Sequence, residues 1–213
     1  SLRLQREQLQ NAVKQASLHS LADEVTGLRN QHRFREDLES AWAYAIRHDL
    51  LLSAVLLDVD DFEATQPGAG ESAVDQVLQA MARILVGSLR TYDVVGCLEK
   101  GRFAMLLLLT DRSEARAVAE RIRSAVEDHE WQTTSITASF GVSTLESSTT
   151  SSQELMDQAL QSLEQARLDG GNQVRHYFQP YGSVTVRDSR IGGATGAGLR
   201  LRKFTELFES FAF

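Results

Sequence analysis

The sequence contains few of the residues that mark secreted or nucleic-acid-binding proteins. Its 213 residues include one cysteine, Cys97, so neither an internal disulfide nor a cysteine-rich metal site can form. The formal net charge is −7, which argues against a broad nucleic-acid surface because phosphate binding needs clustered lysine and arginine. No apolar run approaches the ~20 residues of a membrane span. These absences predict a cytoplasmic protein without nucleic-acid partners or a membrane span, in which Cys97 is a buried structural thiol.

The residues that are present have the composition of an ordinary globular protein. Hydrophobic residues make up 42% of the sequence and aromatic residues 7%, with charged residues distributed along the chain. A chain of this length can form one domain with a full core and an appendage. We therefore expect one core.

The apolar patterns between Asn30 and Phe178 predict an α/β domain in which helices flank a central sheet. A nearly continuous apolar run over Leu51–Leu57 indicates a central strand that is buried on both faces. The other expected elements, in chain order, are a helix from the N-cap Asn30 to His48, a helix beyond Gly70, a hairpin of Val94–Leu98 and Phe103–Leu109, a helix over Ser113–Glu127, a strand over Thr134–Val142, a helix from a capping box at Ser151 and Glu154 to Arg167, and a strand over Gln173–Phe178.

Two flanking segments have a different character. Residues 1–22 carry an apolar stripe that continues to Val25 and predicts a signalling helix, either half of a short coiled coil or packed on its own domain. Residues 179–213 form a C-terminal extension with a glycine-rich linker and an amphipathic helix. We expect that helix to dock on this domain or on a partner protein rather than on a membrane, through the face of Phe204, Leu207, Phe208 and Phe211.

Acidic residues follow the predicted central strand. Asp58 and Asp60 could hold one Mg²⁺ weakly, and a solvated strand end explains them equally well. The five histidines share no metal-ligand spacing.

Several local sequences resemble the GGDEF domains of the diguanylate cyclase family. Asp23–Asn30 is similar to the family's D-x-L-T-G-L-x-N opening, and Leu56–Phe62 to its L-L-D-I-D-x-F strand end. Ala138–Val142 and Ala159–Asn172 resemble two later family motifs. The resemblance implies a GGDEF domain over residues 23–178, a nucleotide-cyclase palm-like fold, and a hairpin turn that carries the G-G-D-E-F signature.

At that turn the sequence departs from the family. It reads Glu99, Lys100, Gly101, Arg102 and Phe103, so only the phenylalanine survives. Family enzymes use two metal ions held by carboxylates at the strand end and in the hairpin. Asp58 matches the strand-end ligand, but Arg102 would repel a cation where a metal ligand belongs. The resemblance therefore implies a degenerate site without catalytic residues, in which we expect no metal, neither Mg²⁺ at Asp58 nor another required cofactor.

The positions that contact the nucleotide are changed as well. Of the two usual guanine contacts, only Asp75 remains. Glu63 stands where the family has a phosphate-side lysine, and Cys97 where it has an arginine before the signature. Arg167 and Gly171 stand where the family has a later lysine and arginine. These changes predict a pseudo-diguanylate cyclase.

A second family site is better preserved. Arg90 and Asp93 form the R-x-x-D of the family's product-inhibition site, and Arg121 matches an arginine that completes it. Arginines suit a phosphate or the Hoogsteen edge of guanine, and an aspartate can accept from guanine N–H donors. The alternative is a surface salt-bridge cluster. We predict an inactive cyclic di-GMP receptor that dimerises on the ligand and signals through a protein partner. The rival hypotheses are a ligand-free scaffold, a residual cyclase and a GTP-binding regulatory module.

Overall fold

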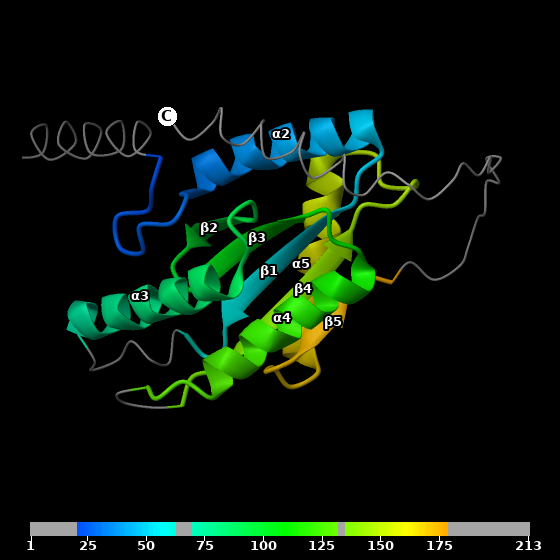
Figure 1. Cartoon of the computed structure of the whole chain (residues 1–213). Helices are drawn as coiled ribbons and strands as arrows, with labels where there is room; N and C mark the ends of the chain where they lie inside the picture. Colours follow the sequence, from blue (N-terminus) through cyan, green and yellow to red (C-terminus); the bar gives the residue numbers. More distant parts are fainter. Residues whose placement is uncertain (1–20, 63–69, 132–134, 179–213) are drawn as a thin grey trace, which may run out of the picture. The chain divides into compact units, whose positions relative to one another are not determined.

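The structure is a computed structural model that describes residues 21–62, 70–131 and 135–178, with only the backbone of Gly70 and Glu71. The chain divides into two compact units, Ser1–Tyr177 and Phe178–Phe213, and the first contains the elements described below (Figure 1). Nearly all of the N-terminal helix expected over residues 1–22, and the extension expected over 179–213, lie outside the described residues.

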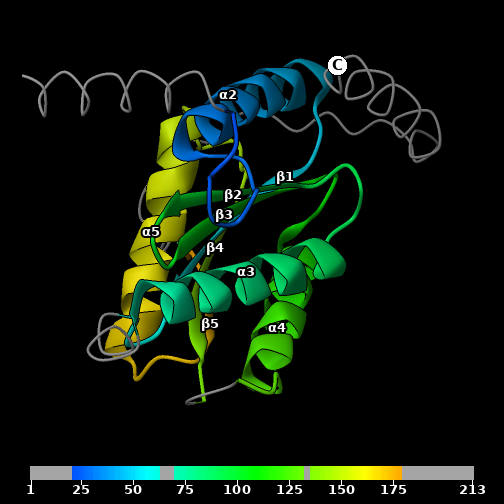
Figure 2. The same cartoon turned by 90° about the vertical axis from the view of Figure 1, so that its left-hand side faces the viewer.

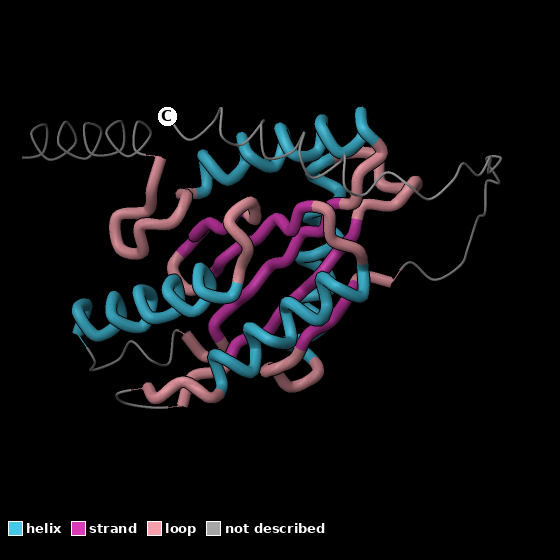
Figure 3. The backbone as a smooth tube through the Cα atoms, viewed as in Figure 1, coloured by secondary structure: helices cyan, strands magenta, loops and turns pink. Residues whose placement is uncertain are grey.

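A five-stranded sheet forms the centre of the first unit (Figure 3). Its spatial order is β2-β3-β1-β4-β5, with β1 antiparallel to both neighbours and β4 parallel to β5. The strands are β1 Leu52–Val59, β2 Val94–Glu99, β3 Arg102–Leu108, β4 Ala138–Thr144 and β5 Val174–His176. The predicted α/β architecture is confirmed.

Four helices in the described part of the chain cover the sheet, α3 and α4 on one face and α2 and α5 on the other (Figure 2). They are α2 Gln31–His48, α3 Gly70–Ser88, α4 Arg112–Glu127 and α5 Ser152–Leu168. The Asn30 side chain caps α2 by accepting from the backbone N–H of Arg33 at 2.9 Å, as predicted.

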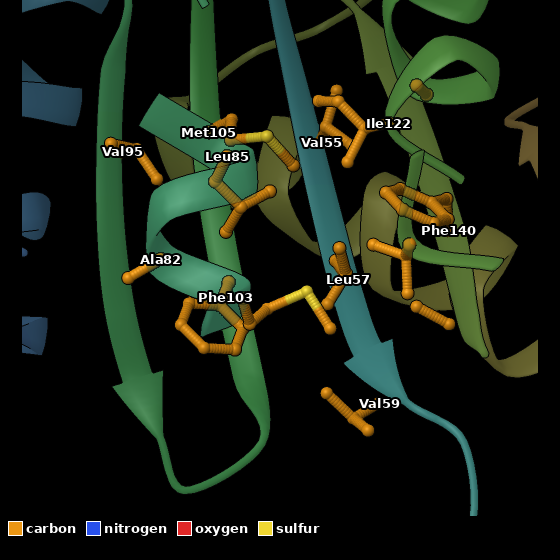
Figure 4. Close-up of a cluster of buried hydrophobic side chains, with 14 of the residues drawn as sticks. Val55, Leu57, Val59, Ala82, Leu85, Val95, Phe103, Met105, Ile122 and Phe140 are labelled. Carbon is orange, nitrogen blue, oxygen red and sulfur yellow. The ribbon is translucent and has the colours of Figure 1, made fainter. Parts of the chain in front are cut away.

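Strand β1 is the centre of the core, as its continuous apolar run predicted. All eight of its residues are buried. Val55, Leu57 and Val59 lie on the face that packs against α3 and α4, together with Phe103 of β3 and Phe140 of β4 (Figure 4). Asp58, the last residue but one of this strand, is buried with it.

Helix α5 lies unusually close to strand β4. A Cβ atom at Gly141 would be 2.0 Å from the carbonyl oxygen of Ala159 and 2.3 Å from the backbone nitrogen of Leu163. Only glycine permits this approach, so α5 and the Arg167 near its end are held against the sheet.

Several predicted boundaries are wrong. The apolar stripe through Val25 is not helical there, because residues 24–26 form a turn that Gly27 follows with φ +70°. Strand β4 begins at Ala138 rather than Thr134, and β5 covers only three residues. At Ser151 half of the capping box is present, since the Glu154 carboxylate accepts instead from Thr150.

A full capping box occurs at α4, where Asp111 and Glu114 satisfy each other's backbone N–H groups. Cys97 is buried, as predicted. Within the described part of the chain, no helix combines the length and apolar character needed to cross a membrane.

Candidate functional site

The end of β1 and the start of β3 bring two opposite charges together. In the antiparallel register Asp58 lies directly opposite Arg102, although the two residues are far apart in sequence. The Arg102 guanidinium donates from Nε to Oδ1 of Asp58 at 2.7 Å and from Nη2 to Oδ2 at 2.9 Å. This is a bidentate ion pair, the strongest common geometry between these two groups.

A second arginine reaches the same carboxylate from helix α5. Nη1 of Arg167 donates to Oδ2 of Asp58 at 3.2 Å. The Asp58 side chain is only 10% exposed, while those of Arg102 and Arg167 are 30% and 57% exposed. The hydrogen bond to Asp58 is the main reason that the pKa of Arg102 is raised above its ordinary value. Both oxygens of the carboxylate are thus occupied by protein donors.

Asp60, the other candidate Mg²⁺ ligand, has a structural role. Its carboxylate accepts from the hydroxyl groups of Thr137 at 2.7 Å and Ser139 at 2.6 Å, and from the backbone N–H of Asn172 at 2.9 Å. These bonds tie the end of β1 to β4 and to the turn after α5. Among the described residues, no group of three or more His, Cys, Asp or Glu side chains is arranged to hold a metal ion.

The turn between β2 and β3 retains one requirement for glycine. Gly101 has φ +86°, and a Cβ atom there would be 2.7 Å from the ring of Phe62. Glu99 and Lys100 are exposed, and Phe103 is fully buried. Of the signature positions, Gly101 forms the tight turn, Phe103 packs in the core and Arg102 supplies a guanidinium to Asp58.

An open cavity of about 660 Å³ is lined by Asp60, Asp61 and Glu164 and by Arg167, which also bonds to Asp58. Asp75, at which the resemblance implied a guanine contact, is half-buried on α3, and residues 63–69 before that helix lie outside the described residues. Asp60, Asp61 and Glu164 give the cavity wall an acidic character, which is unfavourable to a polyphosphate.

The R-x-x-D residues form a tight turn after α3. The backbone N–H of Asp93 donates to the carbonyl oxygen of Arg90 at 3.0 Å. The Asp93 carboxylate accepts from the backbone N–H of Arg90 at 3.0 Å and from that of Leu108 at 3.3 Å. Burial raises the pKa of the Asp93 carboxyl, and these two bonds oppose the rise. Asp93 therefore shapes the turn besides being a candidate ligand contact.

Arg121 of α4 comes to the same turn from a distant part of the chain. Its Nη2 donates to the carbonyl oxygen of Ser88 at 2.7 Å, at the last residue of α3. Its positive charge acts on Asp93, as does that of Arg90. The structure thus brings the three predicted ligand residues, Arg90, Asp93 and Arg121, to one place on the surface. Tyr92, which the sequence analysis did not single out, contacts Arg90 there.

The five-stranded sheet flanked by helices has the fold of a nucleotide-cyclase type of α/β domain, and comparison with known proteins identifies the family. The family described as "Diguanylate cyclase, GGDEF domain" matches residues 20–173. The chain belongs to the GGDEF domain family.

The individual relatives reported below share less than a third of their aligned residues with this chain. The diguanylate cyclase DgcS of Shewanella oneidensis is 28% identical over 77% of this chain and 56% of its own length. Among solved structures, the coiled coil and GGDEF domain of DgcB from Caulobacter crescentus in complex with c-di-GMP has a TM-score of 0.70 at 23% identity, over 82% of this chain and 94% of that one.

The diguanylate cyclase SiaD from Pseudomonas aeruginosa, in complex with its activator SiaC, has the same TM-score at 26% identity over 82% of this chain and 70% of that one. The chain spans about half the length of DgcS and 14% of the probable diguanylate cyclase DgcE of Escherichia coli.

Proposed function

We propose that this GGDEF domain is a catalytically inactive receptor for cyclic di-GMP, which binds at Arg90, Asp93 and Arg121. The observation that carries the proposal is the position of Arg121, whose hydrogen bond to Ser88 holds a guanidinium from α4 beside the R-x-x-D turn. The alternative, a surface salt-bridge cluster of Arg90 and Asp93, does not explain why Arg121 from a separate helix is held beside them.

Catalytic inactivity is inferred from the state of Asp58. A two-metal phosphoryl transfer needs carboxylate oxygens that are open to cations. Here the two oxygens accept from Arg102 and Arg167, and releasing them would leave a poorly solvated carboxylate beside two guanidinium groups. This donor set does not fit the metal centre that the family implies, so the proposal includes no step through a metal.

The ligand site has the chemistry of a guanine dinucleotide. An arginine fork can donate two parallel hydrogen bonds to a phosphate or to the N7 and O6 acceptors of guanine. Asp93 already accepts one backbone N–H at each oxygen, and a carboxylate oxygen has a second lone pair for a guanine N–H. Cyclic di-GMP, which is present in the related DgcB structure, offers both kinds of group.

We further propose that residues 23–178 are the receptor domain, and that residues 1–22 and 179–213 transmit the bound state. Such a ligand could bridge two copies of the chain at the exposed arginines, and ligand-linked dimerisation would follow from its preference for the bridged state. SiaD, which has a protein activator, is a precedent for control of a related protein by a partner.

Calorimetric titration of the whole chain tests the proposal. We expect cyclic di-GMP to bind and Arg121→Ala to abolish the binding. Arg116→Ala, which removes an exposed arginine from the same helix, should leave it unchanged. No heat from the parent chain would favour the ligand-free scaffold.

Incubation with GTP and Mg²⁺ separates the receptor from the enzyme. We expect no cyclic di-GMP. Product that disappears in Asp58→Ala would show a residual cyclase, and GTP binding without product would favour a GTP-controlled module.

A further inference from the structure

The Arg90 side chain contacts Tyr92 in two ways. Its Nη1 donates to the phenolic oxygen of Tyr92 at 3.0 Å. Its Cζ lies 5.9 Å from the centroid of the same ring, within the range of a cation–π contact. The Tyr92 side chain therefore contacts the Arg90 guanidinium through both its phenolic oxygen and its ring.

The turn places these two side chains together. The hydrogen bond from Asp93 N–H to the carbonyl of Arg90 closes a four-residue turn, and the Asp93 carboxylate ties that turn to Arg90 and to Leu108 of β3. Tyr92 is half-buried within the turn, whereas Arg90 is exposed. The half-buried ring of Tyr92 thus limits the movement of the exposed Arg90 side chain.

We propose that Tyr92 is a positioning residue that holds the Arg90 guanidinium ready for an anionic or guanine ligand. This inference rests on the proposed function. It adds Tyr92 to the three proposed ligand residues Arg90, Asp93 and Arg121. A free arginine samples many rotamers and loses that freedom on binding. An arginine that is already held loses less, so Tyr92 raises affinity without touching the ligand.

The two arginines of the site are anchored differently. Arg121 is held by a backbone carbonyl, that of Ser88, which no side-chain substitution removes. Arg90 is held by a side chain, so its anchor can be tested by substitution. Tyr92→Phe keeps the ring and removes the hydrogen bond, and Tyr92→Ala removes both contacts.

The first readout needs no ligand. Arginine side-chain NMR of the whole chain reports guanidinium rotation, and Arg90→Ala assigns the signal. We expect slow rotation at Arg90 in the parent, faster rotation in Tyr92→Phe and the fastest in Tyr92→Ala. Tyr44→Phe, which removes a hydroxyl group from α2, should leave the signal unchanged. Equal rotation in the parent and both Tyr92 variants would overturn the inference.

The second readout is the Kd for cyclic di-GMP by calorimetry. Loss of one hydrogen bond predicts roughly a 2- to 10-fold weaker Kd for Tyr92→Phe, with a larger loss for Tyr92→Ala. Tighter or unchanged binding in both variants would overturn the inference and show that the contact restrains Arg90 unproductively or has no effect. A parent chain that holds Arg90 through Tyr92 but binds no ligand would refute the receptor function and support the positioning contact.

Discussion

Arg102 donates to both oxygens of the Asp58 carboxylate, at 2.7 and 2.9 Å, across the antiparallel pair of β1 and β3. Arg102 is the first residue of β3, directly after the turn, and the register of the two strands places it opposite Asp58. Arg102 therefore holds a permanent positive charge against the carboxylate near the end of β1.

The ion pair should stabilise the fold. Arg102→Ala would leave the nearly buried Asp58 with only the longer bond from the exposed Arg167. Since a hydrogen bond to a charged group contributes about 1.5–3 kcal/mol, we expect the free energy of unfolding to fall by about that amount in urea denaturation.

Arg167→Ala is the matched control. It removes a more exposed partner of the same carboxylate, and we expect a loss of about 0–1 kcal/mol. Equal urea midpoints for the parent and Arg102→Ala would contradict the structural role of the pair.

Gly141→Ala should destabilise the domain, because the added methyl group would overlap the backbone of α5 at Ala159 and Leu163. Overpacking of this kind costs about 1–3 kcal/mol or more. Gly87→Ala on α3 is the control, because beyond its chain neighbours and the backbone of its own helix no atom of the described residues lies within 4 Å of the added Cβ. We expect stabilisation of up to about 1 kcal/mol. Thermal unfolding measures both, and a neutral Gly141→Ala would refute the close packing.

Cys97 should be unreactive in the folded chain, because burial raises the pKa of its thiol from 9.0 to about 12. We expect slow labelling by a thiol reagent at pH 8 and rapid labelling after unfolding. Above pH 9 the unfolded chain loses this proton before the folded chain does, so the free energy of unfolding should fall as the pH rises from 9 to about 12. Cys97→Ala should reduce that slope, and equal labelling of folded and unfolded chains would disprove burial of the thiol.

His176 should weaken the fold in acid. Burial lowers the pKa of the imidazole below 6.5, and the nearby charges of Arg112 and Arg116 act in the same direction. The hydrogen bond between the imidazole and the carbonyl oxygen of Tyr177 and the charge of Glu146 oppose this shift only in part. As the pH falls below about 6.5 the unfolded chain takes up the proton first, so the free energy of unfolding should decrease.

Urea denaturation between pH 7 and pH 5 tests this dependence. His176→Gln should show a smaller decrease than the parent, and His129→Gln, at an exposed histidine, should behave like the parent. The same decrease in the parent and His176→Gln would contradict the assignment.

The fold was predictable where one signal dominated the local sequence. The apolar run of β1 and the Asn30 cap of α2 each identify an element without tertiary information. Strand β4 was placed too early because an apolar pattern does not show where its partners end. The capping box of Asp111 and Glu114 was visible as D-x-x-E but was missed.

The sequence suggested the residues of the candidate site but not the contacts between them. Sequence comparison placed Arg102 near Asp58, whereas the bidentate geometry and the approach of Arg167 depend on strand register and helix packing. Asp60 was treated as a possible metal ligand because its donors Thr137, Ser139 and Asn172 lie far along the chain. Tyr92 was passed over because no family motif marks its contact with Arg90.

The most direct test of the receptor function is the Kd for cyclic di-GMP of the parent chain beside that of Arg90→Ala, with GTP as the control ligand and Arg83→Ala, on the preceding helix, as the control variant. We expect binding by the parent and Arg83→Ala, none by Arg90→Ala, and no competition from GTP. Binding that survives Arg90→Ala, or a parent chain that binds no cyclic di-GMP, would contradict the proposal.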